Sequence, residues 1–222
     1  MSKKIIVVTP HPDDETLGCG GTLLKYKDKG FQLYWLIVTS MHEKFPKDRK
    51  EKRQQEINLV AKQYQFDEVF QLNFPAAELD KIPLGELVES FSRVFLKVEP
   101  QIIFTVYPGD IHSDHKVVFD ATMSCTKWFR YPFVESVYLY ETLSETDFSI
   151  NPDTNGFRPN VYINISNYLE KKIEIMEIYH SEIGDFPFPR SEKAIRSLAY
   201  LRGAASGFEA AEAFMLLKER IE

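Results

Sequence analysis

The stretch that decides the fold is "KIIVVTPHPDDETLGCGGTL" (residues 4–23), in which an apolar run leads directly into a histidine, three carboxylates and several glycines. The run "IIVV" is typical of a buried β-strand. A polar turn follows it, and then a helical pattern that ends at Gly30. The adjacent carboxylates at 13–15 repel one another, so we expect a positive charge beside them.

Apolar runs of strand length alternate with helical patterns through the first two-thirds of the chain. Strands are expected at 4–9, 33–40, 68–74, 101–107 and 136–143, and helices at 21–30, in the second half of 43–66, at 84–98 and at 114–129. This alternation predicts βαβ crossovers and a mostly parallel, Rossmann-like α/β sheet with helices on both faces.

The last third of the chain has a different pattern. It predicts a strand at 161–166, a helix at 167–180, a loop rich in Pro and Gly, and a helix at 208–220. We therefore expect one domain over 1–222, with a core at about 1–145 and an appended C-terminal α+β region at about 146–222.

Composition excludes several classes of protein. The 222 residues are 44% hydrophobic and 27% charged, as in an ordinary globular protein. The net charge of −6 offers no general attraction for a nucleic-acid backbone, and no apolar run is long enough to span a membrane. Two cysteines far apart in the sequence argue against a disulfide framework and favour a cytoplasmic location.

Two polar clusters follow predicted strands: "PHPDDE" (residues 10–15) and "YPGDIHSDH" (residues 107–115). Ligands of open α/β sheets bind beyond the carboxyl ends of the strands, so these clusters are expected to converge in space.

The two clusters together contain the groups of a catalytic metal site. Such a zinc site takes three imidazole or carboxylate ligands and leaves a position open for water. The matching set is His11, Asp14 and His115. The groups left for proton transfer and oxyanion stabilisation are Asp13, His112 and Asp114. Each cluster alone is also compatible with a turn whose carboxylate caps the following helix, but the pair favours a metal.

The other polar features carry weaker signals. The glycines at 18–21 lack the G-x-G-x-x-G spacing of a dinucleotide loop, which favours close packing of helix on sheet. Cys19 is interpreted as a small buried residue. His42 and His180 have no partner motif and are interpreted as residues of the surface or behind the metal ligands. Arg53 heads the pattern "RQQE" and is a candidate to face the site and bind hydroxyls or a phosphate.

The motifs "PHPDDETLGCGGTL", "RQQE", "GDIHSDH" and "RGAASGFEAAEAF" occur in this order over nearly the whole chain. Together they resemble the PIG-L / LmbE-like family of zinc-dependent de-N-acetylases, which act on N-acetylglucosamine-type sugars. Two positions depart from the family pattern: Pro10 stands where many members have Ala, and Asn164 where many have Asp.

The resemblance implies a role for each candidate residue. It implies zinc ligation by His11, Asp14 and His115. It implies Asp13 as the general base, His112 as the oxyanion or acid partner oriented by Asp114, and Arg53 as a substrate contact. A zinc-bound water would then release acetate from an N-acetyl amino sugar, although another divalent metal suits the same ligands. The implied partner is a small-molecule substrate, and homo-oligomerisation is compatible with the sequence.

Three alternatives remain open at this point. The protein can be an amidase on another small amide such as a thiol conjugate. It can be a metal-dependent sugar-binding protein without turnover, or a nucleotide-binding Rossmann protein, which the glycine spacing disfavours.

Overall fold

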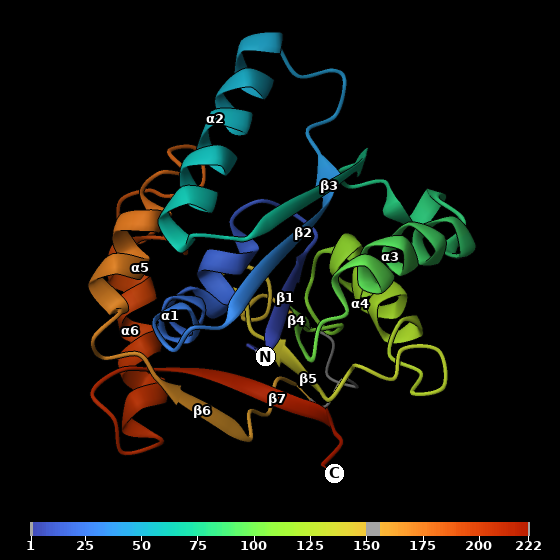
Figure 1. Cartoon of the computed structure of the whole chain (residues 1–222). Helices are drawn as coiled ribbons and strands as arrows, with labels where there is room; N and C mark the ends of the chain where they lie inside the picture. The colour runs from blue at the N-terminus through green and yellow to red at the C-terminus, as the bar shows by residue number, and fades with distance from the viewer. Residues whose placement is uncertain (1, 150–155, 222) are drawn as a thin grey trace.

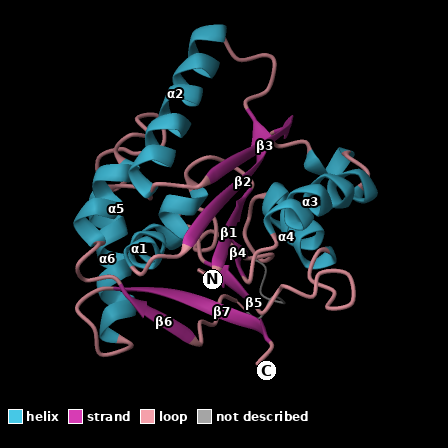
Figure 2. Cartoon of the chain, in the orientation of Figure 1, coloured by secondary structure: helices cyan, strands magenta, loops and turns pink. Residues whose placement is uncertain are grey.

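The computed structural model describes residues 2–149 and 156–221, and its centre is a mixed seven-stranded sheet (Figures 1 and 2). The strand order is β3-β2-β1-β4-β5-β7-β6. Their bounds are β1 Lys4–Thr9, β2 Gln32–Ser40, β3 Glu68–Pro75, β4 Ile102–Val106, β5 Ser136–Tyr140, β6 Val161–Asn164 and β7 Ala211–Glu219. Strands β1 to β5 pair in parallel, whereas β7 runs antiparallel to both of its neighbours.

The middle of the sheet forms the core because its strands are covered on both faces. All five residues of β4 are buried, as are residues 5–9 of β1. In the parallel register, Val7 of β1 pairs with Trp35 on one side and Phe104 on the other. Continuous apolar runs of this kind are what a two-sided parallel sheet requires.

Helices cover the two faces of the sheet (Figure 1). The helices on one face are α1 Asp14–Asp28, α2 Lys47–Tyr64, α5 Leu169–Met176 and α6 Glu192–Ala204. On the other face lie α3 Leu84–Val98 and α4 Ser113–Ser124, with the short 3-10 helix η1 Leu79–Lys81 beside α4. Within the described residues, no helix combines the length and the apolar composition needed to cross a bilayer.

The predicted fold class is confirmed, and the five strands of the first two-thirds occur where the pattern placed them. The predicted helix at 208–220 is wrong, because residues 211–219 form β7. Its Ala-, Glu- and Leu-rich sequence has high helix propensity, but pairing with β5 and β6 overrides it. The expected Pro- and Gly-rich loop also contains α6, whose start is capped by Ser191 accepting the Ala194 N–H at 3.3 Å.

The C-terminal elements also complete α1, which is broken at Cys19 (φ −144°, ψ 20°). Glu212 of β7 accepts the N–H groups of Gly21 and Thr22 at 2.9 and 2.7 Å, and so caps the second half of the helix. The ammonium of Lys172 on α5 donates to Glu212 at 2.7 Å. These backbone groups would otherwise be buried without partners, so α1 depends on residues far along the chain.

The glycines of α1 permit the close packing predicted for them. An added Cβ at Gly18 would lie 2.1 Å from the Tyr140 ring, and one at Gly21 would lie 2.8 Å from Ile165. Both distances are too short for a real side-chain contact, so the helix approaches β5 and the segment after β6 through bare backbone.

Candidate active site

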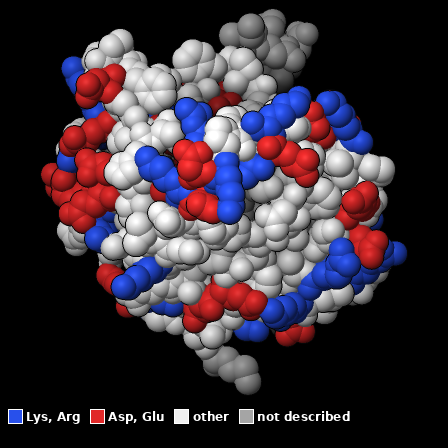
Figure 3. All heavy atoms as spheres, turned by 90° about the horizontal axis from the view of Figure 1, so that it is seen from above, with Lys and Arg blue, Asp and Glu red and all other residues white. Residues whose placement is uncertain are grey.

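The site lies in a pocket of about 530 Å³ formed by the loops that follow strands β1 to β5, by one side of α2 and by the segment between α5 and α6. Ligands of parallel sheets bind at this end of the strands. Seen from above, the molecule carries basic and acidic side chains interspersed across the middle of its face (Figure 3).

The structure brings together the three residues expected to bind a metal. His11 follows β1, Asp14 begins α1, and His115 lies in the first turn of α4. Their potential ligand atoms all lie within 4.8 Å of one another. Nε2 of His115 lies 3.6 Å from one oxygen of Asp14, and Nδ1 of His11 lies 3.6 Å from the other. Residues about 100 positions apart therefore present three ligand atoms to one small volume.

His115 supplies the observation that points to a cation. Its Nδ1 hydrogen-bonds the carboxylate of Asp110 at 2.7 Å, but its Nε2 is buried and has no hydrogen-bond partner among the described residues. A buried ring nitrogen without a partner requires an explanation, and a metal ion is one. Burial lowers the pKa of His115 to about 3, which keeps the imidazole neutral as metal binding requires.

His11 is held in a similar way by Asp114. Nε2 of His11 lies 3.0 Å from the Asp114 carboxylate, which also accepts the N–H groups of Ala77 at 2.7 Å and Leu79 at 3.2 Å. Although burial raises the pKa of Asp114, the hydrogen bonds from His11 and Ala77 hold it below its ordinary value. Each candidate histidine ligand thus has a carboxylate on its other ring nitrogen, which is typical of metal centres.

The arrangement around His112 differs from the expectation. The Asp114 carboxylate lies 4.0 Å from Nδ1 of His112, beyond hydrogen-bond distance, so it orients His11 instead. Nδ1 of His112 accepts the backbone N–H of Asp114 at 3.2 Å, because His112 is the N-cap residue of α4. Burial, and then the charge of His11, lower the pKa of His112, which favours its neutral form. His112, His11 and Asp114 also form a second group of potential ligand atoms within 4.8 Å.

Asp13 lines the pocket in a strained backbone conformation with φ 140° and ψ −28°. Such a φ is costly for a residue with a Cβ, on the order of 1–3 kcal/mol, and persists where neighbouring groups hold it. Glu15 is one of those groups: its carboxylate accepts the Asp13 N–H at 3.1 Å and the Tyr179 hydroxyl at 2.8 Å. Burial, and then the nearby charge of Glu182, raise the pKa of Asp13 well above its ordinary value.

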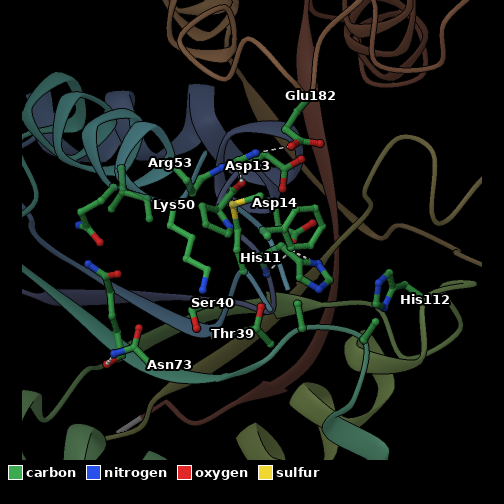
Figure 4. Close-up of a pocket in the computed structure, with 18 of the residues that line it drawn as sticks. His11, Asp13, Asp14, Thr39, Ser40, Lys50, Arg53, Asn73, His112 and Glu182 are labelled. Carbon is green, nitrogen blue, oxygen red and sulfur yellow. Dashed lines mark hydrogen bonds and ion pairs between the residues drawn. The ribbon is translucent and has the colours of Figure 1, made fainter. Parts of the chain in front are cut away.

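Arg53 lines the pocket, but most of its donors bind protein groups. It donates to the carbonyl of Pro12 at 3.0 Å, lies 3.3 Å from the Glu56 carboxylate and forms an ion pair with Glu182 (Figure 4). The guanidinium therefore ties α2 to the turn between His11 and Asp13. Direct contact with a substrate stays a prediction.

Sequence reasoning missed three residues around the site. They are Asp110, Glu182 and Arg190. Arg190 donates to Ser144 at 2.9 Å and lies 3.1 Å from the Glu182 carboxylate, so it connects the segment after α5 to the loop after β5. Asp110 stands in "GDIHSDH", just after a strand and just before a pair of histidines. This position could have predicted a carboxylate that hydrogen-bonds the ring of a metal-binding histidine.

The residues away from the metal candidates lie as expected. Cys19 is fully buried inside α1, and Nε2 of His42 lies 3.9 Å from the Glu78 carboxylate. Neither belongs to a group of potential metal ligands within the described ranges 2–149 and 156–221.

Residues 6–126 match the model of the PIG-L family, described as GlcNAc-PI de-N-acetylase. The chain belongs to the PIG-L family. The matched segment contains both polar clusters and Arg53, so the pocket is built mainly from the family's own segment.

Two curated PIG-L-like relatives and one solved structure illustrate the similarity. The diacetylchitobiose deacetylase of Thermococcus kodakarensis is 25% identical over 95% of this chain and 81% of its own length. A probable N-acetyl-alpha-D-glucosaminyl L-malate deacetylase 2 of Bacillus anthracis is 21% identical over 81% of each chain. The structure of N,N'-diacetylchitobiose deacetylase from Pyrococcus horikoshii superposes with a TM-score of 0.78 at 20% identity, covering 98% of this chain and 84% of that one. At this identity the structural likeness shows the fold.

Proposed function

We propose that the protein is a metal-dependent hydrolase that removes the acetyl group from an N-acetylated amino sugar or sugar conjugate. The observation that carries the proposal is the buried Nε2 of His115, which lies beside Asp14 and His11 and has no hydrogen-bond partner among the described residues, in a chain of the PIG-L family. The names of the relatives support an acetamide on a glucosamine ring as the bond to be cleaved.

The donor set fits Zn²⁺, with His11, Asp14 and His115 as the residues that would hold it. Two neutral imidazoles and one carboxylate suit zinc, and other divalent metals accept the same set. When bound, such an ion supplies Lewis-acid polarisation of the acetamide carbonyl and acidifies a water molecule. Asp110 and Asp114 fix the rings of His115 and His11, so the ligand atoms are held in place before the metal arrives.

Asp13 is proposed as the general base. Its carboxylate lines the pocket beside Asp14, and its raised pKa brings it closer to the range in which a base works at neutral pH. The strained backbone, held by Glu15, aims this side chain at the pocket while Asp14 faces the two histidines.

His112 is proposed to stabilise the oxyanion as a neutral hydrogen-bond donor. Because Nδ1 of His112 accepts the Asp114 N–H, the neutral ring carries its proton on Nε2. That N–H has no hydrogen-bond partner in the described part of the chain, so it can donate to the acetyl oxygen as negative charge develops there. Asp114 then contributes to catalysis through His11 and through the backbone N–H that fixes His112.

The test separates metal binding from turnover. Asp13→Asn is expected to keep its metal after dialysis and to lose about 100-fold or more of its acetate release from N-acetylhexosamine conjugates. His115→Ala is expected to lose the metal itself, as measured by elemental analysis. The matched control is Asp120→Asn, an exposed carboxylate on α4, which should change neither quantity.

Three outcomes would contradict the proposal. If Asp13→Asn turns over near the wild-type rate, Asp13 is not the base. Release of bulkier acids but not of acetate would indicate an amidase on other small amides, such as thiol conjugates. Sugar binding without hydrolysis by the metal-loaded protein would indicate a binding protein. A cytoplasmic location and a homo-oligomer stay predictions.

A further inference from the structure

The loop that follows β5 places a carboxylate in the pocket. Glu145 lines the pocket and is half-buried there. Within residues 2–149 and 156–221, its carboxylate forms neither a hydrogen bond nor an ion pair. Removal of water from a carboxylate is costly unless a hydrogen-bond donor replaces that water. A substrate that fills the pocket is therefore expected to bring a donor to Glu145.

The other carboxylates of the pocket are engaged or lie elsewhere; they are Asp13, Asp14, Glu43 and Glu182. Asp14 is a candidate metal ligand, and Asp13 is the proposed base. Glu182 is paired with both Arg53 and Arg190. Glu43 is exposed and lies beside Lys50 of α2, whose ammonium donates to the Glu43 carbonyl at 3.2 Å. Glu145 is therefore a pocket carboxylate that is available to the substrate.

Glu145 is anchored next to His112. Its backbone carbonyl accepts the N–H of Ile111, the residue before His112, at 3.2 Å. Burial raises the pKa of Glu145, and the charge of His112 opposes that rise, so the two side chains lie within electrostatic range of each other. Glu145 therefore lies on the side of the pocket where His112 is proposed to bind the acetyl oxygen.

Hydrogen bonds hold the loop of Glu145 in one conformation. The Thr142 carbonyl accepts the N–H groups of Glu145 at 3.1 Å and of Thr146 at 2.9 Å. The Thr146 hydroxyl accepts the Thr142 N–H at 2.8 Å and donates to the Asp110 carboxylate at 2.6 Å. Asp110 in turn hydrogen-bonds the ring of His115. The loop is thus fixed relative to the candidate metal ligands.

We propose that Glu145 binds the nitrogen of the scissile acetamide, accepting its N–H at first and holding the amine once the bond is broken. This inference rests on the proposed deacetylase function and adds a catalytic residue to it. The amide nitrogen and the carbonyl oxygen are bonded to the same carbon. An oxygen beside His112 therefore brings the nitrogen within reach of a carboxylate that is anchored next to His112.

A carboxylate suits this position because its hydrogen bond strengthens during the reaction. The amide and one water become acetate and an ammonium: the C–N electron pair stays on nitrogen, and both protons of the water finish there. The contact with Glu145 thereby changes from an ordinary hydrogen bond to a charge-assisted one. An interaction that strengthens after the substrate has bound raises kcat. A contact with a ring hydroxyl would stay constant and would affect only KM.

The experiment compares the wild type, Glu145→Gln and the matched control Asp147→Asn, an exposed carboxylate two residues farther along. Acetate release is measured on the methyl glycoside of N-acetylglucosamine and on its 2-O-acetyl isostere, an ester with oxygen in place of the N–H. Calorimetry on the metal-loaded proteins then compares methyl glucosaminide with neutral methyl glucoside, at a pH at which the amino sugar is an ammonium. The binding experiments carry Asp13→Asn, so that Asp13 does not contribute to the preference for the cation.

Glu145→Gln is expected to lower kcat for the amide about tenfold, the difference between a charge-assisted and a neutral hydrogen bond. KM should change little, because the glutamine carbonyl still accepts the amide N–H. Hydrolysis of the ester should be unaffected. The preference for the ammonium over the neutral sugar should fall about tenfold in Glu145→Gln, whereas Asp147→Asn should change none of these quantities.

Equal losses on amide and ester, a raised KM at unchanged kcat, or a similar loss in Asp147→Asn would overturn the role of Glu145 while leaving the deacetylase function intact. An ammonium preference that depends on Glu145, without acetate release from the amide, would support the amine contact and contradict the proposed function. If the ester is not hydrolysed, the ammonium preference decides, and a preference unchanged in Glu145→Gln overturns the inference. Binding of neither sugar would overturn it as well.

Discussion

The close approach of α1 to β5 predicts that Gly18→Ala destabilises the protein, although alanine is the better helix former. The new Cβ would lie 2.1 Å from Cδ2 and 2.6 Å from Cγ of the Tyr140 ring. Tyr140 is fully buried, and its hydroxyl donates to the carbonyl of Val8 at 2.9 Å, so the ring is held at both ends. Relief of the clash requires a shift of the ring or of the helix.

The opposing contributions can be compared in free energy. Overpacking a buried site costs about 1–3 kcal/mol, and weakening the Tyr140 hydrogen bond adds about 1 kcal/mol. The higher helix propensity of alanine compared with glycine offsets about 1 kcal/mol of this destabilisation. Because the contact falls far below a normal van der Waals distance, we expect the free energy of unfolding of Gly18→Ala to fall by about 2–3 kcal/mol.

Urea unfolding followed by circular dichroism measures this change. The matched control is Gly85→Ala in α3, where an added Cβ meets no described atom within 4 Å. This variant should be as stable as the wild type or more stable by up to about 1 kcal/mol. If Gly18→Ala behaves like Gly85→Ala, the close packing of α1 against β5 is refuted.

Three further predictions concern a carboxylate behind the site, a buried ion pair and the two buried cysteines. Asp110→Asn should weaken metal affinity by about 10-fold or more, because it removes the carboxylate that hydrogen-bonds Nδ1 of His115. Competition with a chelator measures this affinity, and an unchanged value would contradict the role of Asp110 in orienting the His115 ring. Glu212→Ala should lower the free energy of unfolding by about 3–5 kcal/mol, because it leaves the buried ammonium of Lys172 unpaired. Addition of Lys172→Met should recover part of this loss, and no recovery would refute the charge explanation. Burial raises the pKa of both cysteine thiols, so little thiolate is present at pH 8. Ellman's reagent should therefore react with neither cysteine until the protein is denatured. Rapid reaction of the native protein would show that the thiols are not buried.

The first two-thirds of the fold was predictable because each strand there is a continuous apolar run bounded by polar turns. Residues 4–9 and 84–98 form a strand and a helix with the predicted bounds. The meeting of His11, Asp14 and His115 followed from the same reasoning, since both clusters come directly after neighbouring parallel strands, β1 and β4.

The remaining features depend on contacts that no local pattern encodes. The sequence of β7 favours a helix by propensity, and its pairing with β5 and β6 is decided by tertiary structure. The hydrogen-bond partner of the Asp114 carboxylate depends on the direction in which the Asp114 side chain points. It points to His11 and not to His112. Glu182 and Arg190 reach the pocket from the irregular segment between α5 and α6, whose path carries no periodic signal.

The capping of the broken helix by Glu212 has a consequence for how the protein is made. The amides of Gly21 and Thr22 lie early in the chain, yet their acceptor is synthesised about 190 residues later. A nascent chain on the ribosome therefore lacks the cap of the second half of α1, which begins with Asp14, until β7 has emerged. Because Asp14 begins this helix and belongs to the proposed metal site, we expect that site to be completed only after synthesis has reached β7.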